Sequence, residues 1–178
     1  MHKSSYEKMK RFVKDHLDNK GSSKVNILDF GSRDVNGCYK SLFSNKNWNY
    51  TGMDIEAGKN VDLVIRNPHD WREIKSSSYD VVVSGQALEH IEFPWDVFKE
   101  IRRILKSTGI ACIIAPSAGP EHRYPIDCWR IYPDGMLALC KYAGLECLNV
   151  YTDWEPKNYA DGSELWKDTV LVAKKTDI

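Results

Sequence analysis

Residues 116–133 gather side chains that suit acid–base chemistry and substrate binding. His122 is a candidate general base, because an imidazole titrates near neutral pH, and Asp127 is a candidate to orient it. The segment also supplies four candidates for binding an acceptor, which are Arg123, Tyr124, Trp129 and Arg130. Guanidinium groups bind anionic substituents, and aromatic rings offer flat faces with a polar edge. The structural alternative is that Trp129 packs the segment onto the fold while Arg130 pairs with a local carboxylate.

A second group of polar residues follows an apolar run that ends near Ser84. Gly85 and Gln86 come directly after this run and are expected to face a cofactor. Glu89 and His90 come next. We expect Glu89 to contact the acceptor, and His90 is the second candidate for the general base. The structural alternative is that Glu89 caps a loop that His90 orders.

Two further strand ends carry residues expected to bind a nucleoside-like cofactor. Gly31 lets the backbone turn tightly and approach a ligand, and Asp29 suits a positively charged or amino group. Asp54 lies 23 residues after Gly31, which is close to the spacing at which an acidic residue accepts hydrogen bonds from ribose hydroxyls. The neighbouring candidates at these two ends are Ser32, Arg33 and Ile55. Asn67 and Pro68, after a third strand end, are candidates for binding an adenine edge.

These residues require a sheet whose strand ends meet at one edge. Apolar runs predict strands at residues 25–30, 48–54, 61–65, 79–84, 110–115, 145–151 and 168–173. Helical spacing and capping residues predict helices at residues 3–18, 37–44, 94–109 and 133–144. The alternation predicts an α/β fold with a Rossmann-like, doubly wound, mostly parallel seven-stranded sheet and helices on both faces. Ligands bind at the C-terminal ends of the strands in such sheets.

The composition narrows the class of protein. The length of 178 residues predicts one domain over residues 1–178, with an N-terminal helix within residues 1–20 and substrate loops at residues 116–133 and 153–166. Lys plus Arg and Asp plus Glu each number 25, so no nucleic-acid partner is expected. Five cysteines without a CxxC pair predict free thiols in a reducing compartment, and we expect a cytoplasmic protein. Neither a secretory signal nor an apolar stretch of ~20 residues is visible.

Four segments together resemble the class I S-adenosylmethionine-dependent methyltransferases of the small type 11 kind. They are residues 27–32, 50–55, 79–84 with 88–91, and 104–109. The resemblance runs over residues 24–150 and implies S-adenosyl-L-methionine as the cofactor, with S-adenosyl-L-homocysteine as the product. It also implies that the methionine part binds at the Gly31 loop, the ribose at Asp54 and the adenine around residues 67–71. Arg33 departs from the family, because many members have a second glycine there.

The sequence alone does not favour a metal site. Some relatives, the small-RNA 2′-O-methyltransferases and the ubiquinone-pathway O-methyltransferases, carry a Glu-x-x-Glu-His metal site at this place. Gln86 replaces the first glutamate here, whereas Glu89 and His90 match the rest. Two matching ligands are too few for such a site. We therefore assign no metal ligand from the sequence and leave a divalent ion as an unfavoured cofactor.

The predicted reaction is O-methylation of a sugar or glycan hydroxyl. The loop at residues 31–37 resembles that of family members found beside glycan-building enzymes, and aromatic, Asp, Arg and His side chains suit a polyol. Natural-product or quinone O-methylation and N-methylation are the alternatives. Arg33 favours another hypothesis, a non-catalytic module that binds S-adenosylmethionine, while the missing phosphate fingerprint argues against a nicotinamide oxidoreductase. The substrate pocket must be completed by the two loops, the N-terminal helix or a partner subunit, so a homodimer is one expectation.

Overall fold

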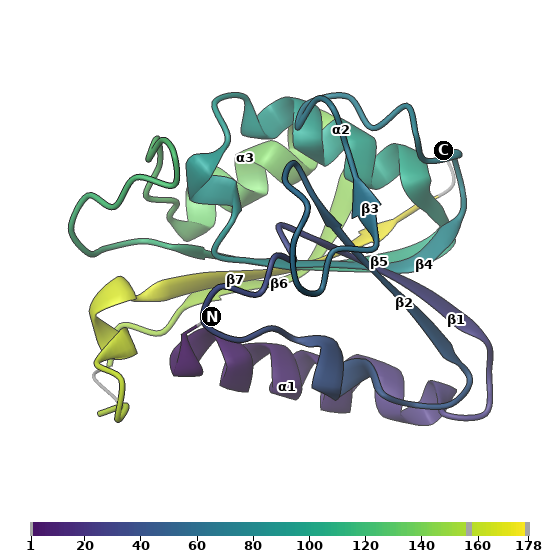
Figure 1. The fold of residues 1–178 in the computed structure, drawn as a ribbon, viewed down its shortest axis with the longest axis horizontal. Coiled ribbons are helices and arrows are strands. Elements are labelled where there is room, and N and C mark those ends of the chain that lie inside the picture. Colours follow the sequence, from purple (N-terminus) through teal and green to yellow (C-terminus); the bar gives the residue numbers. More distant parts are fainter. Residues whose placement is uncertain (1, 156–157, 177–178) are drawn as a thin grey trace.

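A twisted sheet forms the middle of the molecule (Figure 1). The computed structural model describes residues 2–155 and 158–176, and within these residues seven strands are hydrogen-bonded in the order β3-β2-β1-β4-β5-β7-β6. The strands are β1 (Val25–Phe30), β2 (Trp48–Asp54), β3 (Leu63–Val64), β4 (Tyr79–Gly85), β5 (Leu105–Pro116), β6 (Leu145–Thr152) and β7 (Asp168–Lys175). The pairs from β3 to β5 are parallel, and β7 is antiparallel to both of its neighbours. The predicted doubly wound, mostly parallel sheet is confirmed.

Helices cover both faces of the sheet, as predicted (Figure 1). The helix α1 (Lys3–Leu17) lies on one face, and α2 (Pro94–Ile104) and α3 (Pro133–Ala143) lie on the other. Successive strand residues point to opposite faces, so Val81 and Val83 of β4 pack in the cluster that includes α1, while Val82 packs in the cluster that includes α2 and α3. This two-sided burial explains why the central strands are nearly continuous apolar runs.

Short helical turns complete the fold. The 3₁₀ turns are η1 (Asp18–Lys20), η2 (Lys40–Phe43), η3 (Leu88–His90) and η4 (Ser163–Trp166). The predicted helix at residues 37–44 is thus a single 3₁₀ turn. The predicted loop at residues 153–166 includes residues 156 and 157, which lie outside the described residues. Within the part of the chain that the structure describes, every helix is too short or too polar to span a bilayer.

Two element boundaries differ from the prediction. The helix from Pro94 ends at Ile104 rather than at Gly109, because the amides of Ser77 and Ser78 bond to carbonyls of its last turn and satisfy groups that another helical turn would have used. The chain then continues directly into β5. The third strand, predicted at residues 61–65, comprises only Leu63–Val64 among the described residues. Asp62, which precedes it, bonds through its side chain and its amide to Gly52 of β2 instead.

The parallel order brings the C-terminal ends of β1, β2 and β4 to one edge of the sheet (Figure 1). The amides of Gly31 and Ser32 both donate to the carbonyl of Met53, at 2.9 Å and 3.1 Å. The end of β1 and the end of β2 are therefore joined side by side. This junction is where the sequence predicts that a cofactor binds.

Candidate functional site

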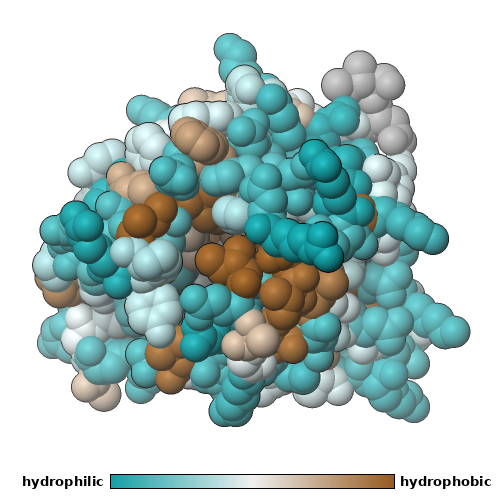
Figure 2. Space-filling view, turned by 45° about the horizontal axis from the view of Figure 1, so that its top comes forward, coloured by the Kyte–Doolittle hydropathy of each residue, from teal (hydrophilic) through white to brown (hydrophobic). Residues whose placement is uncertain are grey.

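A cavity of about 550 Å³ opens at the C-terminal ends of β1, β2 and β4. Its walls come from the loops after these strands and from residues 122–125 of the long segment after β5. Val35, Ile55 and Tyr124 line it and are largely exposed. In Figure 2, hydrophobic side chains gather near the middle of the face shown. A cavity of this size with mixed apolar and polar walls suits one small-molecule ligand with its reaction partner.

The carboxylate of Asp54 stands at the β1–β2 junction. One of its oxygens accepts a hydrogen bond from the amide of Arg33 at 3.1 Å, and the other accepts from the amide of Glu56 at 3.3 Å. An ionised carboxylate has about four acceptor positions, so two of them are left for ligand donors. The prediction that Gly31 and Asp54 lie at adjacent strand tips is confirmed, since both line the cavity.

The side chain of Arg33 turns to the rim of the cavity. Its guanidinium forms an ion pair with Glu56, and its aliphatic stem lies against Gly58. Because Glu56 neutralises it, the charge does not oppose a cationic ligand in the way that a free arginine would. Arg33 stands beside the cavity rather than across it.

The positive φ of Gly31 confirms the predicted tight turn, and close packing is a further reason for glycine at Gly31 and Gly85. A Cβ atom at Gly31 would lie 2.3 Å from the Cβ of Ala87, and Gly31 has a φ of 71°. A Cβ at Gly85 would lie 1.8 Å from the hydroxyl oxygen of Tyr39, a fully buried residue that the sequence reasoning missed. Both glycines line the cavity. They also allow close packing between neighbouring loops.

Asp29 is buried at the end of β1 and lines the cavity. The hydroxyl of Tyr50 donates to its carboxylate at 2.6 Å, and the side chain of Asn60 donates to that same hydroxyl at 2.9 Å. Burial raises the pKa of Asp29 to about 7, while the Tyr50 bond opposes the shift. A positively charged ligand beside Asp29 would favour its ionised form.

The loop after β1 is fixed by a residue that the sequence analysis did not single out. Asn60 donates through its side chain to the carbonyl of Ser32 at 2.9 Å, and the hydroxyl of Ser32 donates to the carbonyl of Asn60 at 2.9 Å. This reciprocal pair ties the Gly31 loop to the segment before β3. Ser32 is buried by these contacts and still contributes to the cavity wall. Asn60 has a φ of 67°, a conformation that asparagine tolerates better than most residues.

Asn67 lies apart from the cavity wall where the sequence predicts that it binds adenine. Its side chain is exposed and is not part of the cavity wall, because its oxygen accepts a hydrogen bond from the amide of His69 at 2.9 Å and closes a local turn. Pro68 does line the cavity, together with Ile65 and Trp71. The adenine end of the cavity is therefore apolar.

The predicted cofactor residues after β4 line the same cavity. Gln86 donates through its side-chain nitrogen to Asp168 at 2.9 Å, and it has a φ of 59°. Its side chain is thus directed toward β7. Ile91 and Ala87 complete this wall. Gly85 and Gln86 stand where the sequence places them.

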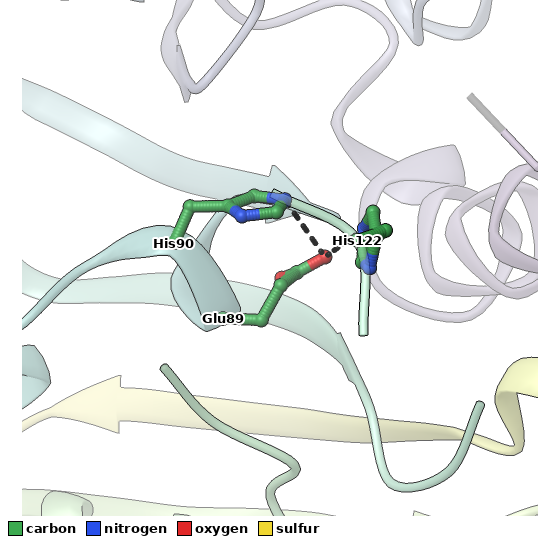
Figure 3. Close-up of side chains that lie close together, drawn as sticks. All are labelled: Glu89, His90 and His122. Atoms are coloured by element: carbon green, nitrogen blue, oxygen red, sulfur yellow. Dashed lines mark ion pairs between the residues drawn. The ribbon is translucent and has the colours of Figure 1, made fainter. Parts of the chain in front are cut away.

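Glu89, His90 and His122 form a compact cluster at the other side of the cavity (Figure 3). One oxygen of Glu89 lies 3.7 Å from Nε2 of His90 and 4.0 Å from Nε2 of His122. Glu89 has no exposed surface, so the prediction that it contacts the acceptor directly is wrong: the two histidines, which line the cavity, are its neighbours. Burial raises the pKa of Glu89 to about 8.

Both histidines are held from their far side. Nδ1 of His90 is 2.5 Å from the carbonyl oxygen of Ile126, and Nδ1 of His122 is 3.5 Å from the carboxylate of Asp127. Arg130 donates twice to Asp127, at 2.7 Å and 2.8 Å, and this pairing holds the pKa of Asp127 well below its usual range. Burial and then the charge of His90 lower the pKa of His122. His122 is therefore a neutral imidazole near pH 7.

The other candidates of the long segment divide into two groups. Arg123 and Tyr124 line the mouth of the cavity and are largely exposed. Trp129 donates its indole N–H to the carbonyl of Ile91 at 2.8 Å, and Arg130 is bound to Asp127. Trp129 and Arg130 lie outside the cavity wall, so the structure gives the prediction that they bind the acceptor no support. Their structural alternatives are confirmed.

A comparison with protein families finds a methyltransferase domain within the chain. Residues 28–113 match the family model described as a methyltransferase domain, and they include the junction of β1 and β2, all of β4 and the Glu89–His90 pair. The match covers just under half of the chain and supports an S-adenosylmethionine-dependent methyltransferase. No curated protein matches the chain at a significant level of sequence similarity.

Solved structures share the fold of the methyltransferase. An N1-methyltransferase of 1,6-didemethyltoxoflavin from Burkholderia thailandensis, solved with S-adenosylhomocysteine, has a TM-score of 0.70 and 15% identity over 97% of this chain and 79% of its own. An S-adenosylmethionine-dependent methyltransferase from Methanosarcina mazei has a TM-score of 0.68 and 14% identity over 93% of this chain and 97% of its own. The cyclase SpnF has a TM-score of 0.69 and 16% identity over 95% of this chain and 81% of its own. At these identities, the likeness concerns the fold.

The cavity of the methyltransferase fits its cofactor. Asp54 has free acceptor positions for ribose hydroxyls, and Asp29 is a buried carboxyl that a cation would ionise. Pro68, Ile65 and Trp71 give an apolar wall for a flat base. S-adenosylmethionine offers each of these partners: two ribose hydroxyls, a sulfonium with an ammonium group, and an adenine ring.

Proposed function

We propose that this methyltransferase transfers the methyl group to a hydroxyl of a sugar or glycan acceptor. The observation that carries the proposal is the pair of imidazoles, His90 and His122, in the wall of the cavity beside the residues that fit the cofactor. A hydroxyl has a high pKa and gains from a base at the transition state. The histidine cluster provides such a base, whereas an amine acceptor would need it less.

S-adenosylmethionine supplies an electrophilic methyl carbon on a positively charged sulfur. The acceptor oxygen forms a bond to this carbon while the carbon–sulfur bond breaks and its electron pair goes to sulfur. The acceptor's O–H bond breaks in the same step, and the proton passes to Nε2 of His122. Asp127 faces Nδ1 of His122 at 3.5 Å and stabilises the imidazolium that results. Asp54 and Asp29 contribute by holding the cofactor in line with the acceptor.

The mouth of the cavity supports an acceptor of mixed polarity. Arg123 and Tyr124 stand on one side, and Val35 and Ile55 stand on the other, all of them largely exposed. Tyr124 can stack on a sugar ring, and Arg123, which pairs with Glu121 at 2.8 Å at the surface, can bind an anionic substituent such as a phosphate of a sugar nucleotide.

The apolar side of the mouth supports a second candidate, a quinone or other natural product. Val35 and Ile55 would pack on a flat apolar ring, which a sugar would not require. The reaction at the hydroxyl and the role of His122 would be the same. The non-catalytic hypothesis rested on Arg33, and the pairing of that residue with Glu56 at the rim weakens it.

An acceptor screen with matched variants tests the proposal. Sugar nucleotides, short oligosaccharides and quinols are incubated with S-adenosylmethionine, and S-adenosylhomocysteine and the methylated product are measured by mass spectrometry. His122→Gln is expected to lower kcat by about 100-fold or more and to leave the affinity for S-adenosylhomocysteine within about twofold. His16→Gln, on the surface of α1, is the control. Methylation of amines alone, or full activity of His122→Gln, would contradict the proposal.

A further inference from the structure

The Glu89 carboxylate is buried, and its contacts with His90 and His122 are ion pairs longer than hydrogen bonds. It has no exposed surface, and among the described residues neither of its oxygens has a hydrogen-bond partner in another residue. An unpaired buried carboxyl is costly, so such a group in a native fold normally has a proton, an ordered water or an ion beside it. The nearest polar atoms are the Nε2 atoms of His90 and His122 (Figure 3).

These three groups do not form a hydrogen-bonded triad. The two N–O separations, 3.7 Å and 4.0 Å, are longer than the ~2.7–2.9 Å of a charge-assisted hydrogen bond. All three candidate ligand atoms lie within 4.8 Å of one another. An ion with ligand bonds of about 2.0–2.2 Å would sit between them after small side-chain rotations. The distances between the Glu89 oxygen and the two Nε2 atoms are therefore too long for hydrogen bonds and leave room for an ion between the three atoms.

The far nitrogens of both histidines are arranged as metal ligands require. The carbonyl of Ile126 is 2.5 Å from Nδ1 of His90 and accepts its proton, which leaves a lone pair on Nε2. The carboxylate of Asp127, which Arg130 fixes, lies farther from Nδ1 of His122, at 3.5 Å, and that nitrogen has no hydrogen bond among the described residues. A carbonyl or carboxylate behind each imidazole sets its tautomer and its orientation toward a metal. Nε2 of His90 thus presents a lone pair beside Glu89, and Nε2 of His122 faces the same carboxylate oxygen.

The backbone holds the cluster together although its members are far apart in sequence. The amides of Cys128 and Trp129 donate to the carbonyl of Glu89, at 2.7 Å and 3.3 Å. These bonds attach the segment that carries His122 to the 3₁₀ turn η3 that carries Glu89 and His90. The sequence offered only two adjacent ligands, and the fold adds the third.

We propose that Glu89, His90 and His122 bind a divalent first-row transition-metal ion, of the class of Mn²⁺, Fe²⁺, Co²⁺ or Zn²⁺, whose open coordination positions face the cavity and take the acceptor oxygen. One carboxylate with two imidazoles is a donor set that this class of ion prefers over Mg²⁺ and Ca²⁺. His90 and His122 line the cavity, with side chains 14% and 33% exposed, while Glu89 lies behind them. The side-chain nitrogen of Gln86 donates to Asp168, and its oxygen is buried without a hydrogen-bond partner among the described residues.

The ion would deepen the proposed function, on which its catalytic role rests. A hydroxyl bound to a divalent cation loses its proton more readily. With an ion bound, both Nε2 atoms would be ligands, and the ion would supply the activation of the hydroxyl that the free Nε2 of His122 supplies in the metal-free protein. The proton is then released to water, and the bond changes at the methyl carbon are unchanged. Metal binding itself requires neither the cofactor nor the acceptor.

Direct metal titration tests the site without reference to catalysis. The full chain is stripped with a chelator and titrated with Mn²⁺, Co²⁺, Zn²⁺ and Mg²⁺ by calorimetry, and the visible absorption of bound Co²⁺ reports its ligands. We expect one Mn²⁺ or Co²⁺ per chain with weaker Mg²⁺ binding. Glu89→Gln, His90→Gln and His122→Gln are each expected to weaken binding by about 10-fold or more.

Two matched controls keep the result interpretable. Cys128→Ser removes an exposed thiol close to the cluster, and His16→Gln removes a distant imidazole; both are expected to retain binding. Thermal unfolding of each variant without metal confirms that it is folded. Absence of saturable binding, or binding that is lost only in Cys128→Ser, would overturn the metal site. In that case methylation of a hydroxyl without metal would leave the proposed function standing, whereas a bound ion with no hydroxyl acceptor would refute the function alone.

Discussion

Asp54→Asn isolates the ribose contact of the cofactor site. Two of the four acceptor positions of the Asp54 carboxylate are used by the amides of Arg33 and Glu56, and two are left for the ribose hydroxyls. The substitution keeps one oxygen and turns the other into a donor. One ribose hydroxyl then loses its acceptor, while the amide of Arg33 can keep an oxygen to bond to.

The expected loss follows from this single contact. A hydrogen bond to a charged group contributes roughly 1.5–3 kcal/mol, and a loss of about 2 kcal/mol corresponds to a rise of about 30-fold in the Kd for S-adenosylhomocysteine. Because Asp54 is only half-buried, the free energy of unfolding is expected to change by less than about 1 kcal/mol. Calorimetric titration gives the first quantity and urea unfolding gives the second.

Analogues make the assignment specific to the ribose. S-adenosylhomocysteine lacking either the 2′- or the 3′-hydroxyl should bind the unaltered protein about tenfold or more weakly. In Asp54→Asn, one of these two penalties should fall below about threefold, because the acceptor is already lost. Asp70→Asn, outside the cavity wall, is the matched control. A folded Asp54→Asn protein that binds within threefold of the unaltered one would refute the ribose assignment.

Three further substitutions test the physical account of the site. The pKa of Asp29 rises from about 4 to about 7 on folding, so the folded state keeps a proton that the unfolded chain loses. The free energy of unfolding therefore falls as the pH rises from about 4 to 7. The difference in free energy of unfolding between Asp29→Asn and the unaltered protein should be up to about 3 kcal/mol more favourable to the variant at pH 7.5 than at pH 4.5. Equal gains at both values in urea unfolding would contradict the shift. Gly31→Ala should lower the free energy of unfolding by about 2–4 kcal/mol, because its Cβ overlaps Ala87 and its φ is 71°. Adding Ala87→Gly should restore the part of this loss that comes from the overlap but not the part that comes from φ. No recovery of stability in the double variant would refute the packing argument. Arg130→Gln should lower the free energy of unfolding by about 1–3 kcal/mol, because it leaves Asp127 without its cation. It should also lower kcat while the Kd for S-adenosylhomocysteine stays within about twofold. An unchanged kcat would count against the positioning of His122 through Asp127.

The sequence predicted those parts of the molecule that depend on local patterns. Apolar runs and helical spacing located the central strands and the helices α1 and α3, because each period reflects burial on one or both faces. The Gly31–Asp54 junction followed from the same patterns, since parallel strands bring their C-terminal ends together. The end of α2 was missed because its last carbonyls are satisfied by Ser77 and Ser78, a contact between separate segments that no local signal marks.

The cluster of Glu89, His90 and His122 shows what sequence reasoning cannot reach. His122 is brought to Glu89 by backbone bonds, and by the His90–Ile126 contact, between η3 and a segment more than 30 residues later. Pairings of this kind produce no periodic pattern in the sequence. The positions of Asn67 and Trp129 outside the cavity wall have a related cause. Both side chains form hydrogen bonds with backbone groups, those of His69 and Ile91, and the positions of these groups depend on how the loops fold.

A crystal structure with S-adenosylhomocysteine bound tests the central claim most directly. The ribose hydroxyls should lie within hydrogen-bond distance of Asp54, the adenine should rest against Pro68 and Trp71, and the sulfur should face the side of the cavity formed by His90 and His122. A ligand bound elsewhere on the chain, or a ribose turned away from Asp54, would contradict the account.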